Sequence, residues 1–345
     1  MTTTSVDLII PNWNGSDLLT AYLPSVCAAA KAYPGPAQVI LVDDASSDDS
    51  LAMLKRDFPD VRVIAHERNL GFGKACGSGA LASQADTLIF LNSDVEVSEN
   101  FIAPLLAPLE NPDNFSTVPL ILEEDERPAR NLITIPYLRR GKIRYRTLDA
   151  NTLQEHEGRN SEPWYTLFPV GCAFAVRREK FMDIGGFDEL FEPFYYEDTD
   201  LGLCAWRRGW TIQVIPSSRV WHKHRGTIAR SFAPVRVKSI RKRNRHLYQI
   251  KNMTSAKLLW SYLAQHSIRT LTDLVMLKPL TLVASVIAIP RLAMSLRSRR
   301  REIRASERSI AEIFSVINTA WIANQDALRT SDPTNSGTSS PASQL

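Results

Sequence analysis

Cysteine is scarce in this sequence, and no two cysteines have the CxxC spacing of a zinc site or a redox pair. Four thiols are scattered along 345 residues: Cys27, Cys76, Cys172 and Cys204. This distribution argues against a structural zinc site and against a disulfide scaffold. It is typical of a protein that folds in a reducing compartment.

Long hydrophobic runs are also missing. The first residues, MTTTSVDLIIP, have neither a basic start nor a long apolar core, so we expect no signal peptide. The most apolar late stretch, PLTLVASVIAIP at 279–290, is shorter than the roughly 18 residues that a membrane-spanning helix needs. We expect this stretch to be buried or to lie in an interface.

Neither of two common glycine-rich nucleotide motifs is complete. ERNLGFGKACGSG at 67–79 follows a predicted strand and leads into a predicted helix, as a dinucleotide fingerprint would. Its glycines do not have the GxGxxG spacing, however, and the segment does not fit the P-loop pattern, GxxxxGK followed by Ser or Thr. The sequence therefore predicts neither motif.

The composition is that of a globular protein, with 44% hydrophobic and 23% charged residues. The formal net charge is only +4, but basic residues are concentrated at 235–252 and 297–304. Such stretches predict an anionic partner, which could be a membrane surface or a nucleic acid. No recognised nucleic-acid-binding module accompanies them, so we expect no nucleic-acid partner.

Strand and helix signals alternate over the first hundred residues. Short apolar runs predict buried strands at 6–11, 38–44, 61–66 and 87–94, and segments with helical spacing separate them at 16–32, 50–58 and 74–84. Later segments predict a strand followed by a helix at 170–181, and another strand at 211–216. This alternation implies an α/β fold with a mostly parallel sheet flanked by helices.

The rest of the chain divides into less regular parts. Residues 110–165 carry scattered prolines and charges, and we interpret them as a flexible connection or lid. From about 228 the pattern is mostly helical, and the tail has the composition of disorder. We therefore expect an α/β domain at 1–228, a basic and apolar helical region at 229–330 and a disordered tail at 331–345.

Polar residues stand where three of the predicted strands end. They are Asn12 and Asn14, Asp43 and Asp44, and Asn92 and Asp94. In parallel sheets, ligands bind outside the carboxyl ends of the strands, so this coincidence predicts a binding site there.

Each candidate in this group also has a purely structural interpretation. Asp94 in LNSDVEV could coordinate a divalent cation that bridges two phosphates, or it could simply favour a turn. Asp43 could accept a hydrogen bond from a pyrimidine or a ribose, or the aspartates after it could cap a helix. His222 and His224 in WHKHRG would point the same way on a strand, where one could bind a metal or both could be structural.

The stretch FYYEDTDLGLCAW at 194–206 has three carboxylates within four positions: Glu197, Asp198 and Asp200. They could form a metal site, a proton-transfer site or an acidic cap on the helix that follows, which Gly209 is expected to end. The positive end of that helix is expected to lower the pKa of Asp198 and keep it ionised.

The ordered series of motifs resembles the family 2 glycosyltransferases with the GT-A fold, in the branch that includes bacterial rhamnosyltransferase-like enzymes. The similarity extends over roughly residues 5–252. The matching segments are IIPNWNG (9–15), VDDASSDDS (42–50), NLGFGKA (69–75), LNSDVEV (91–97), the run from Val170 to Trp210 that contains GGFDE and EDTDL, VWHKHRGT (220–227) and RNRHLYQIKN (243–252).

This resemblance implies a hexosyltransferase that depends on Mg²⁺ or Mn²⁺. It would move a sugar, with inversion, from a UDP- or dTDP-linked donor to a hydroxyl of a glycan or polyprenyl-diphosphate-linked acceptor, in cell-surface polysaccharide assembly. It also implies a cytoplasmic enzyme at the cytoplasmic face of the inner membrane.

The resemblance further implies a role for particular residues. Pro11, Asn12, Trp13, Asp43, Arg68, Asn69 and Asn92 would bind the nucleotide. Asp94 and His222 would hold the metal, and Asp198 would be the general base, with Glu197 and Asp200 shaping the acceptor side. The DxD-like motif reads Asn92-Ser93-Asp94, so an amide replaces its first carboxylate, and Gly77 stands where an asparagine is common.

Two rival functions remain open. A sugar nucleotidyltransferase would have a similar topology, but its usual glycine-rich N-terminal loop is missing here. A non-catalytic scaffold that binds nucleotide sugars would tolerate the amide at Asn92. The apolar and basic residues of 255–300 likewise allow two interpretations: binding to an anionic membrane leaflet, or a helical subdomain packed on the core with solvated arginines.

Overall fold

The computed structural model describes residues 4–331, except 140, 149, 152, 154–161, 224–231 and 278–279. His224, the domain boundary expected at 228 and the tail beyond Ser331 lie outside the described residues.

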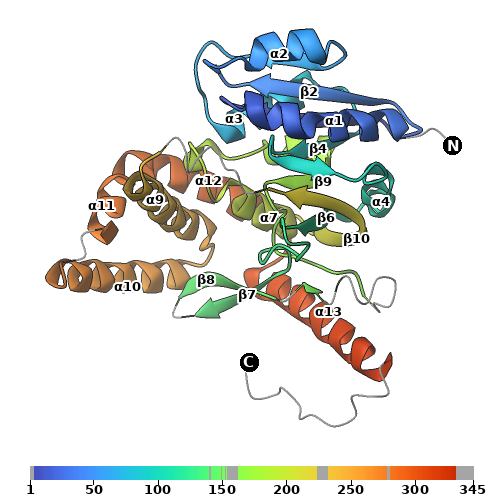
Figure 1. Cartoon of the computed structure of the whole chain (residues 1–345). Coiled ribbons are helices and arrows are strands. Elements are labelled where there is room, and N and C mark those ends of the chain that lie inside the picture. The colour runs from blue at the N-terminus through green and yellow to red at the C-terminus, as the bar shows by residue number, and fades with distance from the viewer. Residues whose placement is uncertain are drawn as a thin grey trace.

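A mixed eight-stranded sheet forms the centre of the molecule (Figure 1). Its order is β3 (Arg62–Ala65), β2 (Ala37–Asp43), β1 (Val6–Asn12), β4 (Thr87–Leu91), β9 (Ala173–Arg177), β6 (Asn114–Leu122), β10 (Thr211–His222) and β5 (Val95–Val97). β9 runs antiparallel to β4 and β6, and β5 runs antiparallel to β10, while the other neighbours are parallel. The prediction of a mostly parallel α/β sheet is confirmed.

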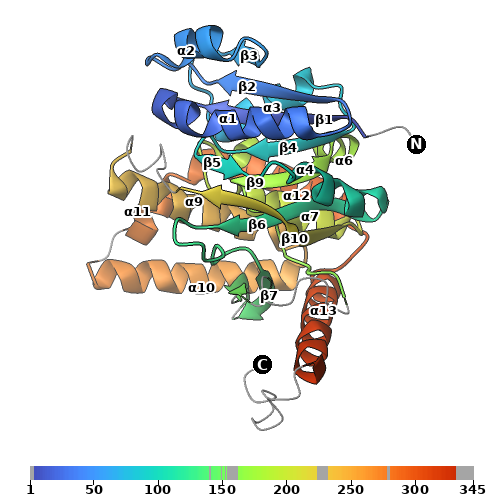
Figure 2. The same cartoon turned by 45° about the vertical axis from the view of Figure 1, so that its right-hand side comes forward.

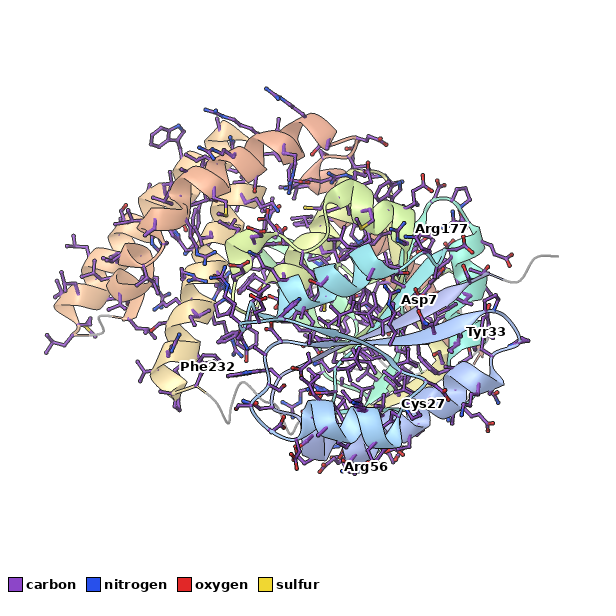
Figure 3. The ribbon with its side chains drawn as sticks, turned by 90° about the horizontal axis from the view of Figure 1, so that it is seen from above. Asp7, Cys27, Tyr33, Arg56, Arg177 and Phe232 are labelled. Atoms are coloured by element: carbon purple, nitrogen blue, oxygen red, sulfur yellow. The ribbon has the colours of Figure 1, made fainter. Side chains whose placement is uncertain are left out.

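Helices cover both faces of this sheet. Figure 3 shows α1 (Ser16–Ala32) and α2 (Ser50–Asp57), where Cys27 and Arg56 lie, on one side of the sheet and the C-terminal helices on the other. α3 (Phe72–Ala82) packs on β1 and β2. Because both faces of the central strands are covered, β1, β2, β4 and β9 are nearly continuous apolar runs rather than alternating ones, whereas the edge strand β3 is largely exposed.

The approach of α3 to the sheet depends on one glycine. A Cβ atom at Gly79 would lie 2.5 Å from Cγ2 of Ile9, closer than any real carbon contact. The small-residue sequence of α3, FGKACGSGALA, therefore lets the helix lie directly against β1.

The interpretation of 110–165 as a flexible connection or lid is wrong for much of its length. β6 is buried at all nine positions and lies inside the sheet, between β9 and β10. Its apolar run is interrupted by Pro119, which lacks an N–H group, and the register of the β6–β10 ladder shifts after the pair of Pro119 with Ile215. β7 (Thr134–Arg139) and β8 (Lys142–Thr147) then form a separate antiparallel hairpin.

The remaining helices of the α/β part are short. They are α4 (Ile102–Leu106), α6 (Arg178–Ile184) and α7 (Glu197–Arg207), with 3₁₀ turns at Ala107–Glu110 and Glu189–Phe191. α7 ends with Arg208 as its cap and Gly209 in the left-handed region (φ 79°), as expected from the sequence.

The last third of the described chain is helical, as predicted. It contains α9 (Pro234–Asn252), α10 (Ala256–Val275), α11 (Leu280–Val286), α12 (Leu292–Ala305) and α13 (Ile310–Ser331), with a 3₁₀ turn at Ile289–Arg291. α9 packs against α10, α11 and α12, and α12 packs against α7. In Figures 1 and 2 the end of α10 and the adjoining α11 project away from the sheet.

Part of the basic charge in this region is structural. Arg243 and Lys251 of α9 are buried, and Arg299 of α12 donates to the carbonyl oxygens of Met253 and Thr254 at 2.9 Å each. These three cations bind protein groups, and the interpretation in which the arginines of 255–300 are simply solvated does not hold for Arg299.

Over the described chain, no single helix combines the length and the apolar character needed to cross a membrane. Taken together, Leu280–Val286 and Ile289–Ala305 pass that test by length and composition, although they are bent by 41°.

Candidate functional site

A pocket opens where the carboxyl ends of β1 and β4 meet the start of α7. Nine of the predicted site residues line it: Pro11, Asn12, Trp13, Asn69, Asn92, Asp94, Glu197, Asp198 and His222. Segments from five strands and loops, far apart in the sequence, therefore meet at the edge of the sheet where α/β proteins bind ligands.

Asp94 and His222 lie side by side in this pocket. β5 pairs with β10 so that Val95 is opposite His222, and the Lys223 N–H donates to the Asp94 carbonyl oxygen at 3.1 Å. This pairing places Nε2 of His222 3.3 Å from Oδ1 of Asp94. Burial alone would lower the pKa of His222, but Cys172 and Asp94 beside the ring raise it to about 10.

Once the imidazole has lost its proton, the pair could hold a divalent cation. Carboxylate suits Mg²⁺ and Mn²⁺, and imidazole is a ligand for transition metals. Among the described residues, no group of three His, Cys, Asp or Glu side chains could hold an ion. A cation at Asp94 and His222 would therefore take its other ligands from a bound diphosphate and from water.

Aromatic rings and the side chain of Asn12 form another wall of the pocket. The Trp13 ring lies 6.0 Å from the ring of Phe232, which in turn lies 5.2 Å from that of Phe194. Asn12 donates to Oδ1 of Asp43 at 2.9 Å, while its own Oδ1 is buried without a hydrogen-bond partner. That oxygen faces Gly15, whose Cβ position would lie only 2.5 Å from it.

The structure does not bring Asp43 or Arg68 to the pocket wall. Asp43 is fully buried and accepts from Asn12 and from both the N–H and the hydroxyl of Ser46. Arg68 is exposed. Asp44 lines the pocket instead, and its carboxylate accepts from the N–H groups of Leu70 and Gly71 at 2.8 Å each.

Three other lining residues were missed from the sequence: Asn131, Phe232 and Arg241. Figure 3 shows Phe232 near the start of α9. Arg241 stands in the basic run at 235–252, which was a signal of an anionic partner, and its guanidinium lies 4.2 Å from the Tyr195 ring centroid. Asn131 and Phe232 have no local pattern that points to a site.

The three neighbouring carboxylates occupy the first turn of α7. Glu197 and Asp198 face the pocket. Asp198 accepts from the Gly171 N–H at 3.2 Å and from the N–H and hydroxyl of Thr199 at 2.6 and 3.1 Å. These bonds fix its orientation at the pocket wall.

Asp200 points away from the pocket into the protein. Its carboxylate accepts from Lys251 and, at 2.8 Å, from the Asn252 amide. Lys251 is fully buried and also donates to Asp188 at 2.8 Å. The prediction that Asp200 shapes the acceptor side is therefore wrong as a direct role, because the side chain belongs to a buried ion cluster.

The pKa of Asp198 is raised, not lowered as expected. Burial outweighs both the positive end of α7 and the hydrogen bonds from Thr199 and Gly171. Burial, together with the charge of Asp198, also raises the pKa of Glu197 to about 8. Two adjacent carboxyl groups thus share a poorly solvated wall.

Curated relatives of the chain are animal glycosyltransferases. N-acetylgalactosaminyltransferase 7 of Drosophila melanogaster is 28% identical over 207 residues, which cover 56% of this chain and 35% of the relative. Polypeptide N-acetylgalactosaminyltransferase 10 of Rattus norvegicus is 28% identical over 210 residues, or 58% of this chain and 34% of the relative. The chain spans about a third of the length of these relatives, and they do not support the expected bacterial rhamnosyltransferase-like branch.

Solved structures show the same fold. GalNAc-T7, crystallised with UDP, GalNAc and Mn²⁺, aligns with a TM-score of 0.54 and 22% identity over 72% of this chain and 49% of that one. S. aureus TarS 1-349 in complex with UDP-GlcNAc aligns with a TM-score of 0.50 and 16% identity over 94% of this chain and 90% of that one. The fold is therefore GT-A, a curled mixed sheet flanked by helices, with a C-terminal helical region.

Two family models match the sequence and agree with the geometry of the pocket. The model of glycosyl transferase family 2 matches residues 7–185, and that of glycosyl transferase family group 2 matches residues 120–323. The chain belongs to glycosyl transferase family 2.

Proposed function

We propose that this protein is an inverting hexosyltransferase that moves a sugar from a UDP- or dTDP-linked donor to a hydroxyl group. The observation that carries this proposal is that Asp94 and His222 share one pocket with Asp198. Asp94 and His222 could bind the cation that accompanies the diphosphate of the donor, and Asp198 could take the proton of the acceptor hydroxyl. The relatives solved with UDP, GalNAc and Mn²⁺ or with UDP-GlcNAc favour UDP as the nucleotide.

A divalent cation bound to Asp94 and His222 would neutralise the charge that develops on the leaving nucleoside diphosphate. Asn12, Trp13, Asn69 and Asn92 would hold the nucleotide in the same pocket. Asp44, rather than Asp43, stands where it could orient the nucleotide-binding loop, because it ties down the N–H groups of Leu70 and Gly71.

Asp198 would remove the proton of the acceptor hydroxyl as that oxygen attacks the anomeric carbon. A single in-line displacement breaks the bond to the diphosphate and inverts the anomeric centre. The hydrogen bonds from Gly171 and Thr199 hold the carboxylate of Asp198, and its raised pKa makes it a stronger base than an exposed aspartate. General-base catalysis of this kind contributes about 10²–10⁴-fold.

Incubation of the protein with candidate nucleotide sugars and Mn²⁺ tests this proposal, with EDTA as the control. We expect metal-dependent release of nucleoside diphosphate, and NMR of the product should show an inverted anomer. Asp198→Asn should reduce turnover at least 100-fold while the UDP dissociation constant changes less than about twofold. Consumption of a nucleoside triphosphate would support a nucleotidyltransferase instead, and binding without turnover would support a scaffold.

We also propose a glycan or polyprenyl-diphosphate-linked acceptor, in cell-surface polysaccharide assembly, and a peripheral position at the cytoplasmic face of the inner membrane. The apolar surface at the end of α10 supports the membrane position. Leu274, Val275, Met276 and Leu277 are consecutive and 47%, 76%, 63% and 88% exposed. Leu274 and Val275 end α10, and Met276 and Leu277 continue beyond it, so these side chains form an apolar tip that lipid can surround.

A further inference from the structure

The segment that leads into α7, the helix that carries Asp198, has an unfavourable backbone conformation. Tyr195 and Tyr196 have φ angles of 71° and 82°, in the left-handed region, and neither is a glycine. In this region the Cβ atom of an L-residue is crowded by the following carbonyl oxygen. Phe194 and Tyr195 line the pocket, and Glu197 and Asp198 follow them directly. The backbone conformation of this segment therefore determines where Phe194 and Tyr195 line the pocket and where the proposed base, Asp198, is placed.

One buried side chain of α9 binds the backbone of this segment. The Asn244 amide nitrogen donates to the carbonyl oxygens of Phe191 at 2.5 Å and of Phe194 and Tyr195 at 2.9 Å each. An amide has two N–H groups, so the three carbonyls share them. The Oδ1 atom of Asn244 accepts from Nε of Arg243 at 2.9 Å.

The neighbouring residues of α9 extend the same contact. Arg243 also donates to the carbonyl oxygen of Glu192, so two adjacent side chains bind four carbonyls between 191 and 195. Two turns later on the same face of α9, Lys251 and Asn252 bind Asp200 in α7. α9 therefore holds the segment before the catalytic helix and the first turn of the helix itself.

We propose that Asn244 is a positioning residue, which fixes the 191–196 backbone so that Asp198 and the wall at Tyr195 face the acceptor. This inference rests on the proposed function, because it assigns Asn244 a part in the same reaction. Asn244 is fully buried and does not line the pocket, so it acts through the backbone and does not touch the substrates. Misplacement of a catalytic group by about 1 Å can cost 10²-fold in rate.

Asn244→Asp tests the inference, because it keeps the size of the side chain but replaces the two N–H donors by an oxygen. Asn244→Ser is a milder second variant, and exposed Asn100→Asp is the matched control. The probes are UDP, measured by calorimetry with Mn²⁺, and the hydrolysis of UDP-GalNAc or UDP-GlcNAc without an acceptor. We expect hydrolysis by Asn244→Asp to fall 10–100-fold, a smaller fall for Asn244→Ser and no change for Asn100→Asp. UDP should still bind one site per chain, with a dissociation constant within about twofold of the wild type.

The number of UDP sites separates positioning from folding. A variant that merely unfolds would lose sites in proportion to its lost activity, and that outcome in both Asn244 variants would overturn the inference. Wild-type hydrolysis rates in both variants would overturn it as well. A wild-type protein that binds UDP-sugars but hydrolyses none would contradict the proposed function itself, which is a different result.

Discussion

Glu197 and Asp198 are adjacent carboxyl groups with different surroundings. Asp198 accepts three hydrogen bonds from Gly171 and Thr199, whereas Oε2 of Glu197 is buried and has no partner. A buried carboxylate with an unpaired oxygen is costly, and a second charge beside it raises the cost further. The proton that the pair retains near neutral pH therefore resides on Glu197, which leaves Asp198 free to act as a base.

Glu197→Gln should remove a pH dependence of stability. The pKa of Glu197 is about 8 in the folded chain and lies near 4.5 in the unfolded one, so only the unfolded chain loses this proton between these values. The free energy of unfolding of the wild type should consequently fall as the pH rises from about 5 to 8. Thermal melting across this range should show a flatter profile for Glu197→Gln. Exposed Glu99→Gln is the control, and equal slopes in all three proteins would contradict the assignment.

Asp94→Asn should uncouple nucleotide binding from the metal. The amide lacks the charge that the cation needs, so the affinity for UDP with Mn²⁺ should fall about tenfold or more, or at least 1.4 kcal/mol. It should then equal the affinity of the wild type in EDTA. Calorimetry provides the measurement, with exposed Asp60→Asn as the control. An unchanged effect of Mn²⁺ in Asp94→Asn would place the cation elsewhere.

At the scale of elements, α7 and α9 are joined by buried charges. Lys251 is fully buried between Asp188 and Asp200, and these two carboxylates raise its pKa further above its usual value despite the burial. A buried ion pair is weak evidence of net stabilisation, but removal of one partner leaves the other charge uncompensated.

Lys251→Met should therefore destabilise the protein by about 3–5 kcal/mol at pH 7. The deficit should shrink at pH 5, because the two aspartates can then take up protons. Adding Asp200→Asn to Lys251→Met should recover part of the loss. Urea denaturation of these variants, with exposed Lys257→Met as the control, checks this prediction. A loss below about 1 kcal/mol would show that the cluster is solvated.

The close packing of α7 depends on Gly202. A Cβ atom there would lie 2.4 Å from Cα of Phe168 and 2.6 Å from the Leu167 carbonyl oxygen, which are backbone atoms that cannot rotate away. Gly202→Ala should destabilise the protein by about 1–3 kcal/mol, even though alanine favours helices. Gly77→Ala in α3 is the matched control, because nothing lies within 4 Å of its Cβ position. That change should be neutral or stabilise by about 0.4–1 kcal/mol in urea denaturation.

At the scale of the whole molecule, the tip formed by α10 and α11 lies apart from the α/β sheet (Figure 1). α11 adds Val283 and Val286 to the exposed apolar surface of α10. α9, which packs against both helices, carries exposed basic residues such as Arg245. An apolar tip beside cationic side chains is suited to the interface of an anionic leaflet.

Liposome flotation should show that the protein binds anionic vesicles at low salt and less well at high salt. Val275→Asp combined with Leu277→Asp should abolish most of this binding without loss of UDP affinity, because no residue of the tip lines the pocket. Leu81→Asp, at a residue that is 66% exposed on α3, is the matched control. Failure of the wild type to float at low salt would contradict the membrane proposal. If the wild type is a dimer and the double variant is a monomer, the tip binds a protein partner instead.

The sequence by itself determined the parts of this protein that depend on local patterns. Apolar runs between helical segments predicted β1, β2, β3 and α1 within one residue at each end, whereas the predicted end of β4 is three residues too late. The buried central strands require such runs because both faces of the sheet are covered there. Four of the six polar residues after those strands line the pocket, since parallel strands end at one edge. The order of the motifs predicted the glycosyltransferase family.

Only the tertiary structure decided which of those residues face the pocket. Asp43 and Asp44 are neighbours in the sequence, yet Asp44 lines the wall and Asp43 is buried. Asp200 is separated from Asp198 by one residue, but the turn of α7 directs it towards Lys251. β6 and the role of Asn244 were not predicted because they depend on contacts between distant segments. The raised pKa of Asp198 has the same origin, since burial is a property of the packed chain and outweighs the local field of the helix.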